Sequence, residues 1–105
     1  MGKHKQTKAC DITDKVRRAV WERDGDKCIF CGRAYCLQVM HYVSRAQGGL
    51  GIEQNLALGC VECHRAYDGI EREWMKAVFA GHLSDHYDNW GDTKLIYNKW
   101  EGLGC

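Results

Sequence analysis

The chain has 105 residues, a usual size for one domain, so a single functional centre is expected. Its formal charge of +1 is unevenly spread: residues 1–50 hold ten Lys and Arg against five Asp and Glu, and residues 51–105 hold five against nine. A basic first half suits a polyanionic partner but is also common on solvated surfaces. No apolar run approaches the roughly 20 residues that cross a bilayer, and the polar start lacks a secretory signal, which together predict a cytoplasmic protein.

The first third of the chain predicts an arm followed by a helix. Residues 1–11 are Lys-rich and show no periodicity, so we predict a flexible basic N-terminal arm there. Apolar residues at helical spacing predict a helix over about residues 14–24, capped by Thr13 or Asp14. The turn residues from Asp24 to Asp26 should end it.

The remainder alternates between short elements. Alternating apolar residues predict a strand over Leu37–Val43 that includes His41, and a second short strand is expected near residues 56–58. The glycine-rich stretch 48–51 must form a loop between them. A helix beginning near Cys60 should carry His64 and Asp68, and apolar clusters predict further helices over residues 71–83 and 93–100.

Seven cysteines are many for this length and indicate either disulfides or a metal site. The expected reducing compartment and two regular Cys-x-x-Cys pairs, Cys28/Cys31 and Cys60/Cys63, favour zinc. Four thiolates leave no open coordination position, so this zinc would be structural rather than catalytic. The other three cysteines lie outside the pattern, and among them Cys36 is near enough to be a rival ligand.

The segment between the two cysteine pairs resembles the HNH endonuclease family. A strand residue His41, a loop residue Asn55 and a helix residue His64 follow one another in that family's order. The stretch 20–25, Val-Trp-Glu-Arg-Asp-Gly, leads into the first cysteine pair as in the family, and residues 47–55 look most like its bacteriophage and prophage members. The resemblance covers residues 15–69 closely and the C-terminal part more loosely.

The resemblance implies a small α+β fold. Its core would be the ββα-metal (His-Me finger) unit of two antiparallel strands and a helix, held by the structural four-cysteine zinc and flanked by N- and C-terminal helices. Residues 12–105 would then form a single HNH nuclease domain, with its core at about residues 15–69 and a helical extension over about residues 70–105.

The resemblance also implies roles for six residues. His41 would be the general base, Asn55 would orient the base side of the site, and His64 would bind the catalytic divalent cation with Asp68 one helical turn later. Arg45 and Arg65 would contact DNA phosphates. Taken singly, these residues have simpler explanations: a strand histidine, a turn asparagine, a residue at a helix end and solvated arginines.

The implied activity is metal-dependent hydrolysis of phosphodiester bonds, nicking or cutting double-stranded DNA with low sequence specificity. The catalytic ion would be Mg²⁺, Mn²⁺ or Ni²⁺, and the likeness to phage members implies DNA processing or packaging beside terminase proteins in a bacterial host. Met40 departs from the family, many of whose members have a metal ligand before the base. A catalytically weak or inactive zinc-stabilised DNA-binding module is therefore an alternative, as is a purely structural domain.

Overall fold

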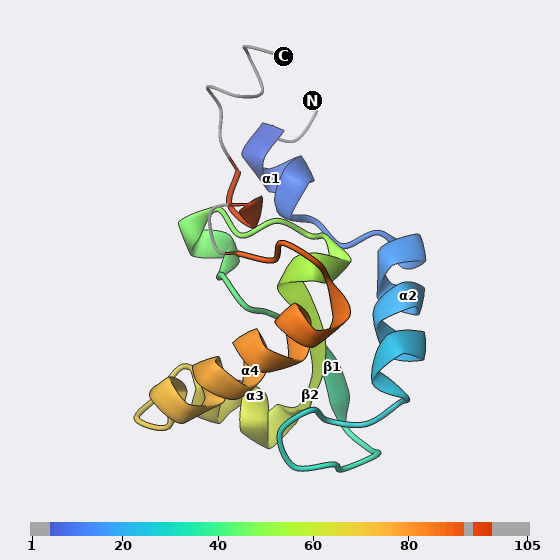
Figure 1. Cartoon of the computed structure of the whole chain (residues 1–105), viewed down its shortest axis with the longest axis vertical. Coiled ribbons are helices and arrows are strands. Elements are labelled where there is room, and N and C mark those ends of the chain that lie inside the picture. The colour runs from blue at the N-terminus through green and yellow to red at the C-terminus, as the bar shows by residue number, and fades with distance from the viewer. Residues whose placement is uncertain (1–4, 92–93, 98–105) are drawn as a thin grey trace.

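The structure is a computed structural model that describes residues 5–91 and 94–97. Its centre is an antiparallel hairpin in which Leu37 pairs with Cys60 and His41 with Leu56. Helix α2 covers one side of the hairpin, and α3 and α4 lie on the other (Figure 1). The elements are α1 (Lys5–Cys10), α2 (Asp14–Asp24), β1 (Leu37–His41), η1 (Arg45–Gln47), η2 (Glu53–Asn55), β2 (Leu56–Cys60), α3 (Val61–Tyr67) and α4 (Arg72–His86).

The two faces of the hairpin contribute to two separate hydrophobic clusters. Met40 and Ala57, which pair across the sheet, belong to the larger cluster, which includes residues of α4. Val39 and Leu58, the next pair, belong to the smaller cluster with Val20 of α2. Because successive side chains of a strand point to opposite faces, the hairpin packs against a helix on each face. All five residues of β2 are buried.

The elements between residues 13 and 86 lie close to the predicted ranges. Thr13 caps α2 by accepting a hydrogen bond from the backbone N–H of Val16 at 3.2 Å, and Gly25 ends it in the left-handed conformation at φ 65°. Strand β1 ends two residues earlier than predicted. The reason is that the Asn55 side chain, and not a strand partner, bonds the backbone N–H and C=O of Val43.

The two ends of the described chain differ from the prediction. A helix, α1, occupies Lys5–Cys10, where the sequence predicted an arm without regular structure; residues 1–4 lie outside the described part. The helix predicted over 93–100 is wrong at the residues that the structure describes. There Ile96 forms an antiparallel bridge with Gly49, and the Tyr97 N–H donates to the Gly48 carbonyl at 2.7 Å. The backbone of the glycine-rich loop thus pairs with Ile96 and Tyr97, which do not form a helix. No helix of residues 5–91 is long and apolar enough to cross a membrane.

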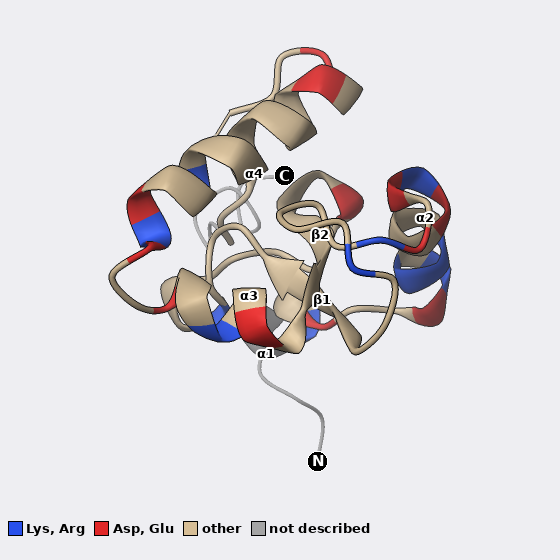
Figure 2. Ribbon diagram, turned by 90° about the horizontal axis from the view of Figure 1, so that it is seen from below, with Lys and Arg blue, Asp and Glu red and all other residues tan. Residues whose placement is uncertain are grey.

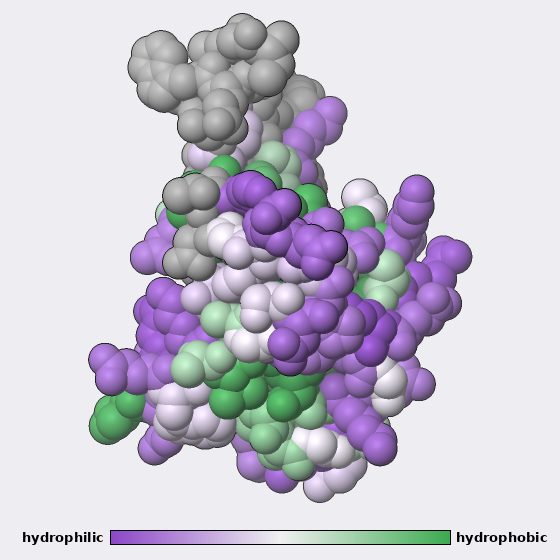
Figure 3. All heavy atoms as spheres, in the orientation of Figure 1, coloured by the Kyte–Doolittle hydropathy of each residue, from purple (hydrophilic) through white to green (hydrophobic). Residues whose placement is uncertain are grey.

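The surface is hydrophilic over most of the face shown in Figure 3, and apolar side chains gather in its lower part. The loop after α2 is joined to α4 by an aromatic contact, in which the rings of Phe30 and Trp74 meet edge-on with centroids 6.3 Å apart. Trp74 is nevertheless 49% exposed, and Ile70, in the turn between α3 and α4, is fully exposed. This contact packs the loop that carries the first cysteine pair against α4.

A buried ionic network ties α2 to β2 and α4. The Asp24 carboxylate, which is fully buried, accepts hydrogen bonds from Arg23, from the backbone N–H of Leu58 at 2.9 Å and from His82 Nε2 at 2.7 Å. Burial alone would raise the pKa of Asp24, but the bonds from His82, Arg23 and Leu58 lower it to about 2. His82 is therefore part of the packing between α4 and α2.

Asp24→Asn tests this network through the pH dependence of stability. Because the pKa of Asp24 falls from 3.8 to about 2 on folding, its ionised form stabilises the native state above pH 3.8, and this contribution is lost as the pH falls towards 2. We expect the variant to lose about 2 kcal/mol at neutral pH and to show a flatter stability profile between pH 4 and 2. Urea unfolding at several pH values measures this, and Asp85→Asn, at an exposed position of α4, is the control. Equal losses in the two variants would contradict the assignment.

Candidate functional site

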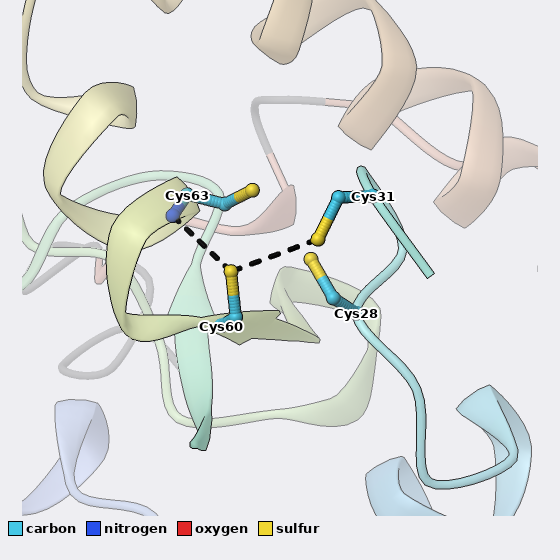
Figure 4. A group of neighbouring side chains, drawn as sticks. All are labelled: Cys28, Cys31, Cys60 and Cys63. Atoms are coloured by element: carbon cyan, nitrogen blue, oxygen red, sulfur yellow. Dashed lines mark hydrogen bonds between the residues drawn. The ribbon is translucent and has the colours of Figure 1, made fainter. Parts of the chain in front are cut away.

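Four cysteine sulfurs converge between the loop after α2 and the start of α3 (Figure 4). The Sγ atoms of Cys28, Cys31, Cys60 and Cys63 all lie within 4.8 Å of one another, and those of Cys31 and Cys60 are 3.7 Å apart. Zinc–sulfur bonds of about 2.3 Å in a tetrahedron place the sulfurs about 3.8 Å apart. The quartet therefore fits a zinc ion. Within the described residues it is the only group of three or more Cys, His, Asp or Glu that converges in this way.

Backbone N–H groups around the quartet favour a thiolate at Cys28. The N–H groups of Phe30 and Cys63 donate to the sulfurs of Cys28 and Cys60, each at 3.4 Å. Burial raises the pKa of Cys28, but backbone N–H groups outweigh it and bring the pKa to about 7. Burial and the neighbouring sulfurs raise the pKa of Cys63. Four thiolates this close together would repel one another without a cation between them, and a closed set of four sulfur ligands would make that cation structural. The rival candidate Cys36 is exposed and lies outside the group.

Cys60→Ser should destabilise the whole centre rather than one loop, because Cys60 ends β2, caps α3 and would be one of the four zinc ligands. Structural zinc contributes on the order of 10 kcal/mol to folding, so we expect the variant to lose its bound zinc and its cooperative thermal transition. Zinc content by mass spectrometry and a thermal melt measure this. Cys36→Ser is the matched control and should retain one zinc per chain; a Cys60→Ser protein that melts like the wild type would show the quartet to be misassigned.

A second group of residues lines a cavity of about 630 Å³ beside β1. His41 at the end of β1, His64 on α3 and Asp68 directly after α3 all lie in its wall. A neighbouring hollow of about 270 Å³ is lined by His64, Asp68, Gln38 and Arg65. The structure thus brings together the three residues that the sequence placed on a strand and a helix, although Asp68 lies 27 positions after His41 in the chain.

The surroundings of His41 determine which ring nitrogen carries the proton. Its Nε2 lies 3.2 Å from the backbone carbonyl oxygen of Cys10. A carbonyl only accepts hydrogen bonds, so Nε2 must be the protonated nitrogen and Nδ1 carries the free lone pair. Burial lowers the pKa of His41; the Cys10 carbonyl opposes this, and the charges of Arg45 and His64 lower the pKa further. His41 is therefore a neutral imidazole at pH 7, with one nitrogen able to accept a proton.

His64 is oriented by a residue that the sequence did not single out. Its Nδ1 lies 2.6 Å from Oε1 of Gln38 on β1. The amide oxygen is an acceptor, so Nδ1 is protonated and Nε2 is left as a ligand atom, the arrangement that metal-binding histidines commonly use. Asp68, the residue that caps α3, is exposed beside it. An imidazole and a carboxylate with room for water suit a divalent cation. Nothing in the sequence pattern around Gln38 marks it as a partner of His64.

Asn55 is fully buried and ties the loop between the strands to the end of β1. Its Oδ1 accepts from the Val43 N–H at 2.9 Å, and its Nδ2 donates to the carbonyls of Val43 at 3.2 Å and Leu50 at 2.8 Å. The backbone carbonyl of Asn55 also accepts from the Tyr42 N–H at 2.7 Å. These bonds hold the residues that follow His41, so the side chain acts through the backbone and does not line the cavity.

Arginine side chains line the cavity and the neighbouring hollow. Arg45, 48% exposed, donates to the Asp11 carboxylate at 2.7 Å and to the Cys10 carbonyl at 3.3 Å. Arg72, at the start of α4, also lines the cavity and lies over the Tyr67 ring at 5.8 Å; the sequence did not single it out. Arg65 is exposed at the smaller hollow.

The residue before His41 faces the core. Met40 is 1% exposed and belongs to the larger hydrophobic cluster. A Cβ atom added to Gly59 would lie 2.1 Å from its sulfur, so the thioether is packed directly over the neighbouring strand. Met40 therefore occupies a core position and not the wall of the cavity, where His64 and Asp68 could bind a metal.

Comparison with known proteins agrees with this geometry. Residues 28–68 match the family model described as HNH endonuclease. No curated protein matches the chain. Among solved structures, the chain is similar to ScoMcrA, a Type IV phosphorothioation-dependent restriction endonuclease, with a TM-score of 0.64 and 21% sequence identity. The similarity covers 81% of this chain but only 19% of ScoMcrA, so the chain corresponds in length to a small part of that enzyme.

The segment from Cys28 to Asp68 therefore carries the HNH motif, in a small α+β fold shared with part of a restriction endonuclease. The resemblance to the HNH endonuclease family found in the sequence is confirmed for residues 28–68, and the predicted fold class with its four-cysteine cluster is confirmed as well.

Proposed function

We propose that the protein is a metal-dependent endonuclease that hydrolyses phosphodiester bonds of double-stranded DNA. One observation carries the proposal: the imidazole of His41, whose Nε2 contacts the Cys10 carbonyl, shares a cavity with a second imidazole and a carboxylate, those of His64 and Asp68. Hydrolysis of a phosphodiester needs a base for water and a cation close to it, and this cavity offers residues for both.

Each residue has a distinct task in this proposal. His41 Nδ1 takes the proton from the attacking water, and the Cys10 carbonyl keeps the proton on Nε2 in place. His64 and Asp68 would hold Mg²⁺, Mn²⁺ or Ni²⁺, which when bound stabilises the charge on the phosphorane and the departing 3′-oxygen. Asn55 keeps the backbone after His41 in position. The products would carry 5′-phosphate and 3′-hydroxyl ends.

DNA binding would depend mainly on phosphate contacts. Arg45, Arg65 and Arg72 stand around the two hollows, and guanidinium groups pair well with phosphate oxygens. Further Lys and Arg residues lie on α2 (Figure 2), where Lys15, Arg17 and Arg18 are exposed. Phosphate contacts position a protein on DNA without reading its sequence. Low sequence specificity follows, unless another domain or protein supplies base contacts.

A supercoiled-plasmid assay tests the proposal. The wild type, with zinc bound and Mg²⁺, Mn²⁺ or Ni²⁺ added, should convert supercoiled DNA to nicked or linear forms, and His41→Ala should lower the rate at least about 100-fold, because general-base catalysis contributes about 10²–10⁴-fold. The zinc content and the thermal melt of His41→Ala should be those of the wild type. His86→Ala, at an exposed position of α4, is the matched control and should nick normally. A His41→Ala protein as active as the wild type would remove this residue from the mechanism.

The pH dependence of nicking follows from the lowered pKa of His41. Only neutral His41 accepts a proton, so activity falls as the pH drops through its pKa, which burial, Arg45 and His64 place below the ordinary 6.5. A bound divalent cation would lower this pKa further. We expect the acidic limb of kcat/KM to have its midpoint below pH 6.5, measured with the plasmid assay at constant ionic strength. A midpoint above about pH 7 would contradict the assignment.

A catalytically weak DNA-binding module is the second candidate, and the burial of Met40 favours it. The cavity then offers only two protein ligands to the cation, so metal affinity would be low. This candidate predicts salt-dependent DNA binding without nicking in any of the three metals.

The setting in the cell is part of the proposal. The resemblance of residues 47–55 to phage and prophage members supports DNA processing or packaging with terminase proteins in a bacterial cytoplasm. The restriction activity of ScoMcrA supports a different setting, in which a nuclease unit of this kind acts beside other domains. Co-purification of the tagged chain from its host, followed by identification of bound proteins, distinguishes the two.

A further inference from the structure

The backbone that bonds His41 lies outside the HNH motif. Residues 28–68 match the family model, whereas the carbonyl that accepts from His41 belongs to Cys10, at the end of α1. The same carbonyl accepts from Arg45 at 3.3 Å. One oxygen of the N-terminal segment, residues 8–11, thus contacts both the candidate base and an arginine of its cavity.

Polar contacts and burial both hold the N-terminal segment in place. The Gly51 N–H donates to the Ala9 carbonyl at 2.9 Å, and the Asp11 carboxylate pairs with Arg45 at 2.7 Å. The Cys10 side chain is 2% exposed, so the segment is packed into the protein as well as hydrogen-bonded. The segment is therefore docked against the loop between η1 and η2.

Gly51 is the point of closest approach. A Cβ atom built there would lie 2.1 Å from the Asp11 carbonyl oxygen and 2.9 Å from that of Cys10. The backbone of Gly51 does not require the left-handed conformation, which residues other than glycine seldom adopt. The absence of a side chain at this position therefore serves the approach of the N-terminal segment and not the shape of the loop.

We propose that the N-terminal segment is a positioning element for the general base, and that Gly51 and Asp11 are the positioning residues that hold it there. If so, the HNH motif needs residues 8–11 to hold its general base in position. The proposal rests on the proposed function for its effect on rate, but the hydrogen bond from His41 to the segment is measurable without catalysis.

Gly51→Ala in the full chain tests the proposal. A methyl group pressed against the Asp11 and Cys10 carbonyls should move the segment off His41. In ¹⁵N-labelled, zinc-loaded protein without a further divalent cation, we expect a solvent-protected Nε2–H resonance of His41 in the wild type and its loss in the variant. The kcat for nicking should fall at least about tenfold, since misplacement by about 1 Å can cost about 100-fold, while KM changes less.

Two further variants make the outcome decisive. Gly81→Ala is the control, because nothing lies within 4 Å of a Cβ atom at that site, and it should keep both the resonance and the rate. Asp11→Asn weakens the ion pair with little change in shape, and should speed exchange of the His41 Nε2–H severalfold. If Gly51→Ala loses its zinc or its cooperative thermal transition, the exchange rate in Asp11→Asn tests the proposal instead.

The inference and the proposed function fail separately. A protected Nε2–H that survives unchanged in folded Gly51→Ala, or an unchanged exchange rate in Asp11→Asn, overturns the positioning role even if the wild type nicks DNA. A wild type that nicks with none of the metals overturns the proposed function, while loss of the resonance in Gly51→Ala still supports the docking of the segment on His41.

Discussion

The sulfur quartet is the constraint on which the rest of the structure depends. One of its members, Cys60, is also the last residue of β2, the cap of α3 and the partner of Leu37 at the start of β1. An ion held by the quartet fixes the hairpin, the following helix and the loop after α2 at one point. The positions of His41 and His64 relative to each other follow from this junction, because one lies at the far end of the hairpin and the other one turn into the helix.

The candidate base is built from three parts of the chain that are far apart in sequence. Strand β1 carries His41, the N-terminal segment supplies the carbonyl that sets its tautomer, and the amide of Asn55 holds the backbone that follows it. Each contact is a hydrogen bond to a buried or partly buried backbone group, which is costly to leave unpaired. The imidazole is therefore fixed before any substrate arrives.

The side of the cavity that is proposed to bind a metal is less enclosed than the side that carries His41. His64 is oriented by Gln38, but Asp68 is exposed, and Met40 is part of the core. An open site with few protein ligands leaves room for water and for a phosphate oxygen on the cation, as in sites where Mg²⁺ is bound together with substrate. The same openness is the physical basis of the alternative in which cation binding is weak.

The sequence by itself determined the elements and residues that local pattern encodes. The Cys-x-x-Cys spacing predicted the zinc site, the period of apolar residues predicted α2 and α4, and the order of His41, Asn55 and His64 indicated the family, because each of these signals lies within a few residues or in a fixed order along the chain. Only the tertiary structure decided that the Cys10 carbonyl reaches His41, that Gln38 orients His64 and that Ile96 pairs with Gly49 instead of continuing a helix. These contacts join backbone or uncharged groups that are distant in sequence, and such groups fit many partners equally well until folding brings one of them within hydrogen-bonding distance.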